Sequence, residues 1–461
     1  MKHLKKWMAA GLALLLTLSL ASCGGSSGTQ GTENPAQEQE EEASSPIGEE
    51  PAKAVPGVTV EEDAASPSGY SAHFVFDAAN AEKTVESVSV SGPFQYVNPS
   101  RGLTEEGNRY GPEAYQNGMY ATNFAPSAGM ADGWGYTVEM EDTDGDGIYE
   151  ASFPITSGSF AYSYVIQYEG EEAPVTIDDP ANPSPAKNNP DSITATGDLT
   201  HSIAYGKWDA EKQSDSPNLD YVLPVGANAG TLSYVPYEGT DGVTQYLGVY
   251  LPAGYDAARE EPYKTIYMSH GGGGNETDWF AMGHLDNIMD NLLSAGETEE
   301  ALVVTMDNAH YEWDFAQIED NVLTKIIPFM EEQYNVSTAA ADRAFAGLSM
   351  GCMTTMHMYF DHPLEFGYFG MFSAADMTAV RENEGLDVPV VMAAVGSCDI
   401  ASATILPETD PDHLIKYESF VEWLDSQELP NITAYGYIPG AHDWFTWSQC
   451  FYHFATEFLW K

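Results

Sequence analysis

Strand-like and helix-like segments alternate through the C-terminal half of the chain, from about Ala229 to Lys461. The strand-like runs are TQYLGVYLPAGY, KTIYMSHGG, ALVVTMDN, RAFAGLS, VPVVMAAVG and NITAYGYIPG. Between them lie segments with apolar residues at helical spacing, namely AMGHLDNIMDNLLSAG, FAQIEDNVLTKIIPFMEEQY, MGCMTTMHMYFDHP and DHLIKYESFVEWLDSQ. This alternation predicts an α/β domain over 229–461, with a mostly parallel sheet covered by helices on both faces. In such sheets a ligand site lies at the carboxyl ends of the strands.

The segment Gly347-Leu348-Ser349-Met350-Gly351 joins one of these strands to a helix. A G-x-S-x-G sequence in this context is typical of a nucleophile elbow, a sharp turn that exposes the serine hydroxyl. The flanking glycines are expected because a side chain at either position would collide with neighbouring backbone. A plain glycine-flanked turn is the alternative, so Ser349 requires a base, an acid and oxyanion donors elsewhere in the chain.

A serine hydroxyl needs a general base within hydrogen-bond reach to act as a nucleophile. His442 lies in GAHDWFTW, just past the last strand-like run and ahead of a terminal helix. His413 and His453 fall within helical segments, where surface or packing roles are expected. His442 is therefore the predicted base.

The predicted acid is Asp399, which directly follows the apolar strand in VMAAVGSCD. A carboxylate there can orient the imidazole and stabilise its protonated form. Asp376, in MFSAADM one strand earlier, is the rival, and Asp443 lies too close to the base along the backbone to fold back easily. The order Ser349, Asp399, His442 is that of the α/β-hydrolases.

The loop from His270 to Gly274, in SHGGGGNETDW, follows another strand. Its bare backbone N–H groups, together with that of Met350, are candidates to bind an oxyanion. A flexible loop or a phosphate nest is the alternative, and the G-K-[ST] ending of a P-loop is missing. Trp279 and Trp444, with Trp313, lie near these loops in sequence and are candidates to stack on a substrate ring or to pack in the core.

Residues 68–185 contain short alternating runs separated by turn residues, which predicts a small β-sandwich. Within it, Asp142, Asp144 and Asp146 begin like an EF-hand calcium loop, but the twelfth position, which should be glutamate, is Phe153. A turn between two strands is the preferred interpretation, and a calcium ion is the alternative. Residues 186–228 are polar and are predicted to connect the two domains.

The N-terminal residues 1–23 have lysines ahead of a short apolar run, as in an export signal. They end in Leu20-Ala21-Ser22-Cys23, which resembles a bacterial lipobox. We expect lipidation of Cys23 and attachment at the outer face of the bacterial cell membrane, with cleavage without lipid as the alternative. Residues 24–63, rich in Gly, Ser, Pro, Gln and Glu, predict a disordered acidic tether.

The formal net charge is −53, from 17 basic and 70 acidic residues. Such a balance repels phosphate backbones, so nucleic acid is not an expected partner. Beyond Cys23 there are three cysteines, without metal-type spacing, so no disulfide framework or zinc site is indicated. A single Cys398–Cys450 bridge is compatible with export and is not derivable from sequence.

Two resemblances follow from these motifs. Gly92-Pro93-Phe94, DGDGIYEASFPI, FAYSYVI and the following DPANP resemble the immunoglobulin-like, glycogen-binding-type module of carbohydrate-active enzymes. In that family the module sometimes binds glycan and sometimes only packs against the catalytic domain. VYLPAGYD, HGGGGNETDWF, GLSMGC, GSCD and GAHDWFTW resemble the bacterial esterase family that includes feruloyl esterases, acetylxylan esterases and esterase D.

The second resemblance implies that Ser349 is the nucleophile, His442 the base and Asp399 the acid. It also implies oxyanion donors at the backbone amides near Gly272 and of Met350. The expected serine mechanism requires no metal or organic cofactor. The expected substrate is a feruloyl or acetyl ester on a plant-cell-wall polysaccharide or oligosaccharide. A siderophore esterase, which joins a related module to a similar domain, and a catalytically silent glycan-binding lipoprotein are the alternatives.

Overall fold

The computed structural model describes residues 54–101, 107–121, 136–183, 202–373, 389–399, 432–434 and 438–461. The predicted export signal, Cys23 and most of the predicted tether lie outside these residues, as do Asp376 and His413. Residues Lys53–Lys461 form one compact unit. Among the helices in the described ranges, none has the length and apolar character needed to cross a membrane.

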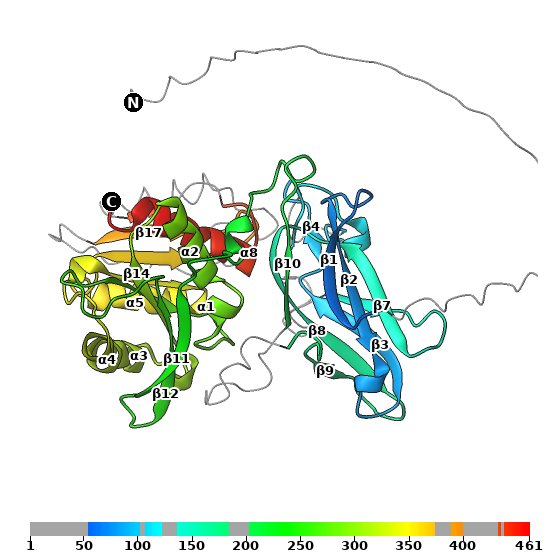
Figure 1. Cartoon of the computed structure of the whole chain (residues 1–461), viewed down its shortest axis with the longest axis horizontal. Helices are drawn as coiled ribbons and strands as arrows, with labels where there is room; N and C mark the ends of the chain where they lie inside the picture. Colours follow the sequence, from blue (N-terminus) through cyan, green and yellow to red (C-terminus); the bar gives the residue numbers. More distant parts are fainter. Residues whose placement is uncertain are drawn as a thin grey trace, which may run out of the picture. The chain divides into compact units, whose positions relative to one another are not determined.

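The N-terminal part is an antiparallel β-sandwich (Figure 1). One sheet has the order β1 (Gly57–Glu62), β2 (Tyr70–Asp77), β7 (Ile148–Pro154). The other has the order β10 (Ser202–Gly206), β8 (Gly158–Tyr168), β3 (Val85–Gly92), β6 (Tyr136–Met140), and β9 (Val175–Ile177) also pairs with β8. A separate short pair is formed by β4 (Tyr96–Val97) and β5 (Tyr120–Ala121). Aromatic rings such as Phe74 and Phe153, stacked at 5.2 Å between centroids, fill the space between the sheets.

The sandwich extends beyond its predicted boundaries of 68 and 185 at both ends. Strand β1 lies inside the predicted tether, where Val58 and Val60 alternate with polar residues and pack on the sandwich core. Strand β10 lies inside the predicted connector and pairs with β8 over its whole length. The predicted boundaries of the tether and the connector are therefore wrong, because acidic and polar neighbours masked two short strands.

The acidic segment between β6 and β7 is a turn, as predicted. One carboxylate oxygen of Asp142 accepts hydrogen bonds from the backbone N–H groups of Gly145, at 2.8 Å, and Asp146, at 3.1 Å. Its other oxygen accepts the N–H of Gly147 at 3.1 Å. Phe153, at the position where a calcium loop needs a bidentate glutamate, is a buried residue of the sandwich core.

The C-terminal part has an eight-stranded sheet, which confirms the predicted α/β class. Its strand order is β11 (Thr231–Glu238), β12 (Thr244–Leu251), β14 (Ala301–Met306), β13 (Lys264–Ser269), β15 (Arg343–Leu348), β16 (Tyr368–Phe372), β17 (Val390–Ala394), β18 (Ile432–Ala434). β12 pairs antiparallel with both β11 and β14, and all pairs from β14 to β18 are parallel. The mostly parallel sheet follows from strands that are buried on both faces.

Two apolar cores cover the two faces of this sheet. Residues of α3 (Phe315–Asn321), α4 (Ile327–Gln333) and α5 (Met350–Asp361) belong to one core. Residues of α1 (Asp278–Ala281), α2 (Leu285–Ala295) and α8 (Trp444–His453) belong to the other. The period of two along a strand divides the side chains between them, so that on β13 Tyr267 joins the first core and its neighbours Ile266 and Met268 join the second.

The helix predicted from Phe315 to Tyr334 is interrupted. A π-helical turn, Val322–Ile326, separates α3 from α4. Pro328 stands at the start of α4. Proline has no N–H and its ring clashes with the carbonyl four residues earlier, so an uninterrupted α-helix cannot pass through this position without distortion.

Candidate active site

Ser349 occupies the turn between β15 and α5. Its backbone has φ 51° and ψ −117°, a strained conformation for a residue with a side chain. A Cβ atom at Gly347 would lie 2.3 Å from the carbonyl oxygen of Gly351, and one at Gly351 would lie 2.4 Å from that of Ser269. Both neighbours are backbone and cannot move aside. The two glycines therefore allow the sharp turn that sequence analysis predicted.

The structure brings Ser349, His442 and Asp399 together in one hydrogen-bonded chain. His442 Nε2 lies 3.0 Å from Ser349 Oγ, and His442 Nδ1 lies 2.9 Å from Asp399 Oδ1. An ionised carboxylate can only accept, so the imidazole proton belongs on Nδ1. Nε2 is then free to accept the proton of the serine hydroxyl, which is the geometry that a nucleophile and its base require.

The other histidine and aspartates that sequence analysis weighed for these roles lie elsewhere or outside the described residues. His453 lies at the end of α8 and pairs with Glu457 at 2.9 Å. Asp443 caps the start of α8, where its carboxylate accepts the N–H of Thr446 at 3.0 Å. Asp376 falls outside the described residues.

Ser373 is a part of the site that sequence analysis missed. Its hydroxyl donates a hydrogen bond to Asp399 Oδ2 and accepts one from Trp447 Nε1 at 2.7 Å. Ser373 follows β16 as Ser349 follows β15, and both have a positive φ. A serine directly after a buried parallel strand was the one available sequence signal.

The electrostatics of His442 favour its protonated form. Burial by itself lowers the pKa of a histidine, but the charge and hydrogen bond of Asp399 and the charge of Asp443 outweigh it, so the pKa is raised above its usual value. Burial raises the pKa of Asp443 to about 6, so it is largely ionised above that pH. An imidazole beside a buried carboxylate is suited to take up a proton from a hydroxyl.

The glycine loop after β13 is held by His270. This fully buried side chain donates from Nδ1 to the carbonyl oxygen of Gly271 at 2.7 Å. The C=O and N–H of one peptide point in opposite directions, so the N–H of Gly272 points away from the ring. A Cβ at Gly272 would lie 3.0 Å from Met350 Sδ, which places the loop beside the start of α5. Met350 is the first residue of α5, where backbone N–H groups have no intrahelical acceptor.

Asp278, also missed from sequence, stands behind this loop. Burial raises the pKa of its carboxyl to about 7. A Cβ at Gly274 would lie 2.0 Å from Asp278 Oδ2, so this glycine is needed for the close approach. A buried carboxyl with a perturbed pKa in a cavity wall is common at functional sites.

Ser349 and His442 open into a cavity of about 890 Å³. Small-molecule sites commonly measure about 300–1,000 Å³. One wall is the α/β domain, with the glycine loop, Met350 and Trp444. The opposite wall comes from the sandwich and includes Phe94 and the start of β8. Ser159 of β8 donates to the carbonyl oxygen of Met282 at 3.0 Å, which fixes the two walls to one another.

The three candidate tryptophans differ in position. Trp444 lines the cavity, as a residue that contacts substrate must. Trp279 has no exposed surface, and its Nε1 donates to the carbonyl oxygen of Ser269 at 2.9 Å. The prediction that Trp279 binds substrate is therefore wrong, since it is a core residue. Trp313 packs edge-on against His270.

Cys352, Cys398 and Cys450 are buried free thiols, so the Cys398–Cys450 bridge considered above is not formed. Burial raises the pKa of the Cys398 thiol to about 12. A thiol with so high a pKa carries no thiolate at neutral pH and is not a nucleophile. Ser349 is thus the hydroxyl or thiol at this site that has a base within reach.

Residues 244–453 match a protein-family model whose description reads "Putative esterase". This part of the chain is similar to that esterase family. The matched region runs from β12 to the end of α8 and includes Ser349, Asp399 and His442.

Two curated relatives match about half of the chain. An endo-1,4-beta-xylanase/feruloyl esterase from Xylanibacter ruminicola is 25% identical over 259 residues, which are 53% of this chain and 34% of the relative. An endo-1,4-beta-xylanase Y from Acetivibrio thermocellus is 28% identical over 273 residues, which are 53% of this chain and 24% of the relative. The chain thus spans only about a third and a quarter of their lengths.

A solved structure, the enterochelin esterase from Shigella flexneri, aligns with a TM-score of 0.52 at 12% identity. The alignment covers 88% of this chain and 96% of that one, so it includes residues of the sandwich as well as of the α/β domain. At this identity the similarity shows a shared fold and nothing about substrate.

Proposed function

We propose that this protein is a serine esterase that hydrolyses feruloyl or acetyl esters on plant-cell-wall polysaccharides or oligosaccharides. The observation that carries the proposal is the hydrogen-bonded chain from Ser349 through His442 to Asp399 at the wall of a cavity. The similarity of residues 244–453 to the esterase family supports the reaction type. The names of the two relatives, which include xylanase and feruloyl esterase, support the substrate class.

In the proposed reaction, Ser349 Oγ attacks the ester carbonyl carbon while its proton passes to His442 Nε2. Backbone N–H groups of Gly272 and Met350 would stabilise the oxyanion. The carbonyl re-forms as the carbon–oxygen bond to the sugar breaks, and His442 gives its proton to the sugar oxygen. A water molecule then gives a proton to His442 and attacks the acyl-enzyme, which releases the acid and restores the Ser349 hydroxyl.

The cavity suits a substrate with a planar acyl group and a sugar. Trp444 lines it and offers an apolar face for a phenolic ring or a sugar face. The contribution of β8 to the wall supports a role for the sandwich in holding the glycan part. Lipidation of Cys23 and a tether to the outer face of the membrane would place this site in contact with extracellular polysaccharide.

The test is hydrolysis by the purified protein of methyl ferulate, acetylated xylan and a siderophore ester, with the released acid measured for each. We expect release of ferulate or acetate, and loss of at least about 10³-fold in kcat in Ser349→Ala. The thermal midpoint of the variant should match that of the wild type, since the substitution removes one oxygen. Turnover unchanged in Ser349→Ala would overturn the mechanism, and hydrolysis of the siderophore ester alone would overturn the substrate class.

A further inference from the structure

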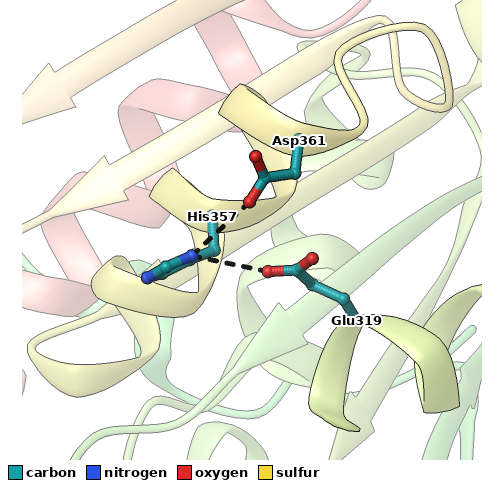
Figure 2. A group of neighbouring side chains, drawn as sticks. All are labelled: Glu319, His357 and Asp361. Carbon is teal, nitrogen blue, oxygen red and sulfur yellow. Dashed lines mark ion pairs between the residues drawn. The ribbon is translucent and has the colours of Figure 1, made fainter. Parts of the chain in front are cut away.

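A group of side chains of the types that can ligate a metal ion lies together, one from α3 and two from α5 (Figure 2). Glu319 comes from α3, and His357 and Asp361 come from the last turns of α5. His357 and Asp361 are four residues apart, which puts them on the same face of the helix. One ligand atom from each of the three lies within 4.8 Å of the other two.

We propose that Glu319, His357 and Asp361 bind a divalent transition-metal ion, with Zn²⁺ as the probe. His357 Nδ1 lies 3.5 Å from Glu319 Oε1 and 3.7 Å from Asp361 Oδ2. Two ligands on a tetrahedral zinc ion, each roughly 2.1 Å from the metal, are about 3.4 Å apart. The distances from His357 Nδ1 to the two carboxylate oxygens are therefore close to those between ligands that share one zinc ion.

The charge balance at Glu319 favours a cation. The Glu319 side chain is 10% exposed, and a carboxylate oxygen of Asp361 lies within 4.8 Å of one of its own. The imidazoles of His357 and His362 face these carboxylates. A divalent ion would neutralise both carboxylates.

Two further contacts hold the candidate ligands in place. The His357 ring stacks on Phe315 of α3, with centroids 4.4 Å apart and planes at 15°. His362 Nε2 lies 3.1 Å from Glu319 Oε2, the oxygen that does not face His357. Hydrogen bonds of this kind orient the ligands of metal sites and raise their affinity. His362 thus helps to hold the Glu319 carboxylate in the orientation that faces His357.

The ligand types select the class of metal. Calcium and magnesium prefer all-oxygen sites, whereas imidazole combined with carboxylates suits zinc and its transition-metal neighbours. His357 is eight residues along α5 from Ser349, a rise of roughly 12 Å, so the ion would not touch the reacting atoms. Its expected effect is to fasten α3 to α5, the helix that begins at the elbow.

The test is Zn²⁺ binding to the purified protein, by equilibrium dialysis with metal analysis and by thermal melting with and without EDTA. We expect saturable uptake and a higher melting temperature with Zn²⁺. His357→Ala, at a side chain that is 45% exposed, should fold normally and lose at least roughly 100-fold in affinity. Glu319→Gln should also lose binding, and His362→Ala should lose roughly 10- to 100-fold.

His453→Ala is the matched control. It removes another helical histidine that pairs with a carboxylate four residues away, Glu457, at 2.9 Å. We expect its Zn²⁺ affinity to equal that of the wild type, and Ser349→Ala should also bind normally, so that the metal site and the esterase mechanism are tested separately. No Zn²⁺ uptake by the wild type, or equal uptake by His357→Ala and the wild type, would overturn the proposal.

Discussion

Replacing Ser373 with alanine tests whether the Ser373 hydroxyl keeps the proposed acid, Asp399, in the position from which it orients His442. This hydroxyl accepts the indole N–H of Trp447 at 2.7 Å and donates to the oxygen of Asp399 that faces away from His442. Ser373, Asp399 and Trp447 are all buried. The substitution thus leaves the Asp399 carboxylate without the donor Ser373 and the Trp447 indole N–H without its acceptor. Because these groups are buried, bulk water cannot easily replace the lost hydroxyl.

The expected magnitude follows from these two bonds. A hydrogen bond to a charged group contributes about 1.5–3 kcal/mol, and leaving a buried N–H without an acceptor costs about 1–3 kcal/mol. The free energy of unfolding of Ser373→Ala should therefore fall by about 3 kcal/mol. Asp399 orients His442, so the loss of the hydrogen bond from Ser373 to Asp399 should also raise the free energy of the transition state. At about 1.4 kcal/mol for each tenfold change, kcat should fall roughly 10- to 100-fold.

The assay is guanidinium unfolding together with kcat on p-nitrophenyl acetate, a small ester that needs no glycan contacts. Ser448→Ala is the matched control, because this buried serine donates one neutral bond, to the carbonyl oxygen of Gly283 at 3.2 Å. It should lose about 1 kcal/mol and keep its kcat. A wild-type kcat in Ser373→Ala would refute the positioning role. A loss of stability no larger than that of the control would refute the charge-assisted bond.

Two further predictions concern the elbow and the base. Gly351→Ala would place a Cβ 2.4 Å from the carbonyl oxygen of Ser269, so we expect about 1–3 kcal/mol or more of destabilisation and loss of ester hydrolysis, measured by thermal melting and kcat. Gly226→Ala, where a Cβ meets no atom within 4 Å, is the control, and equal effects in the two variants would contradict the steric argument. The raised pKa of His442 keeps the base protonated to a higher pH, so the acid limb of kcat/KM should lie above that of free histidine. Asp443→Asn keeps a side-chain oxygen that can cap α8, but it removes a negative charge that raises the pKa of His442. The acid limb of kcat/KM should therefore move to lower pH in this variant. An acid limb at the wild-type pH would show that the Asp443 charge does not act on His442.

The α/β class and the positions of Ser349, Asp399 and His442 were accessible from the sequence for one physical reason. Buried parallel strands are nearly all apolar, so the residues at their carboxyl ends stand out as the first polar positions after each run. The same reasoning placed the glycine loop. It did not extend to β1, where two valines among acidic residues form an edge strand that resembles a linker in composition.

What the sequence could not supply is contact between distant residues. Trp279 lies near the glycine loop in sequence, yet α1 turns its indole inward to a backbone carbonyl of β13. Glu319 and His357 lie on separate helices and carry no shared local pattern, and their meeting depends on how α3 packs on α5. Proximity along the chain predicts proximity in space only when the intervening backbone direction is known.

The sandwich supports the segment that carries the proposed base, beyond forming a cavity wall. A Cβ at Gly158, the first residue of β8, would lie 3.3 Å from the ring of Phe445, in the first turn of α8. Asp443 caps that turn and directly follows His442. The imidazole must stay within hydrogen-bond reach of Ser349 and Asp399 at once, so movement of this turn would break one bond or the other. Packing of β8 against Phe445 limits that movement, and the sandwich therefore acts on the geometry of the base as well as on the shape of the cavity.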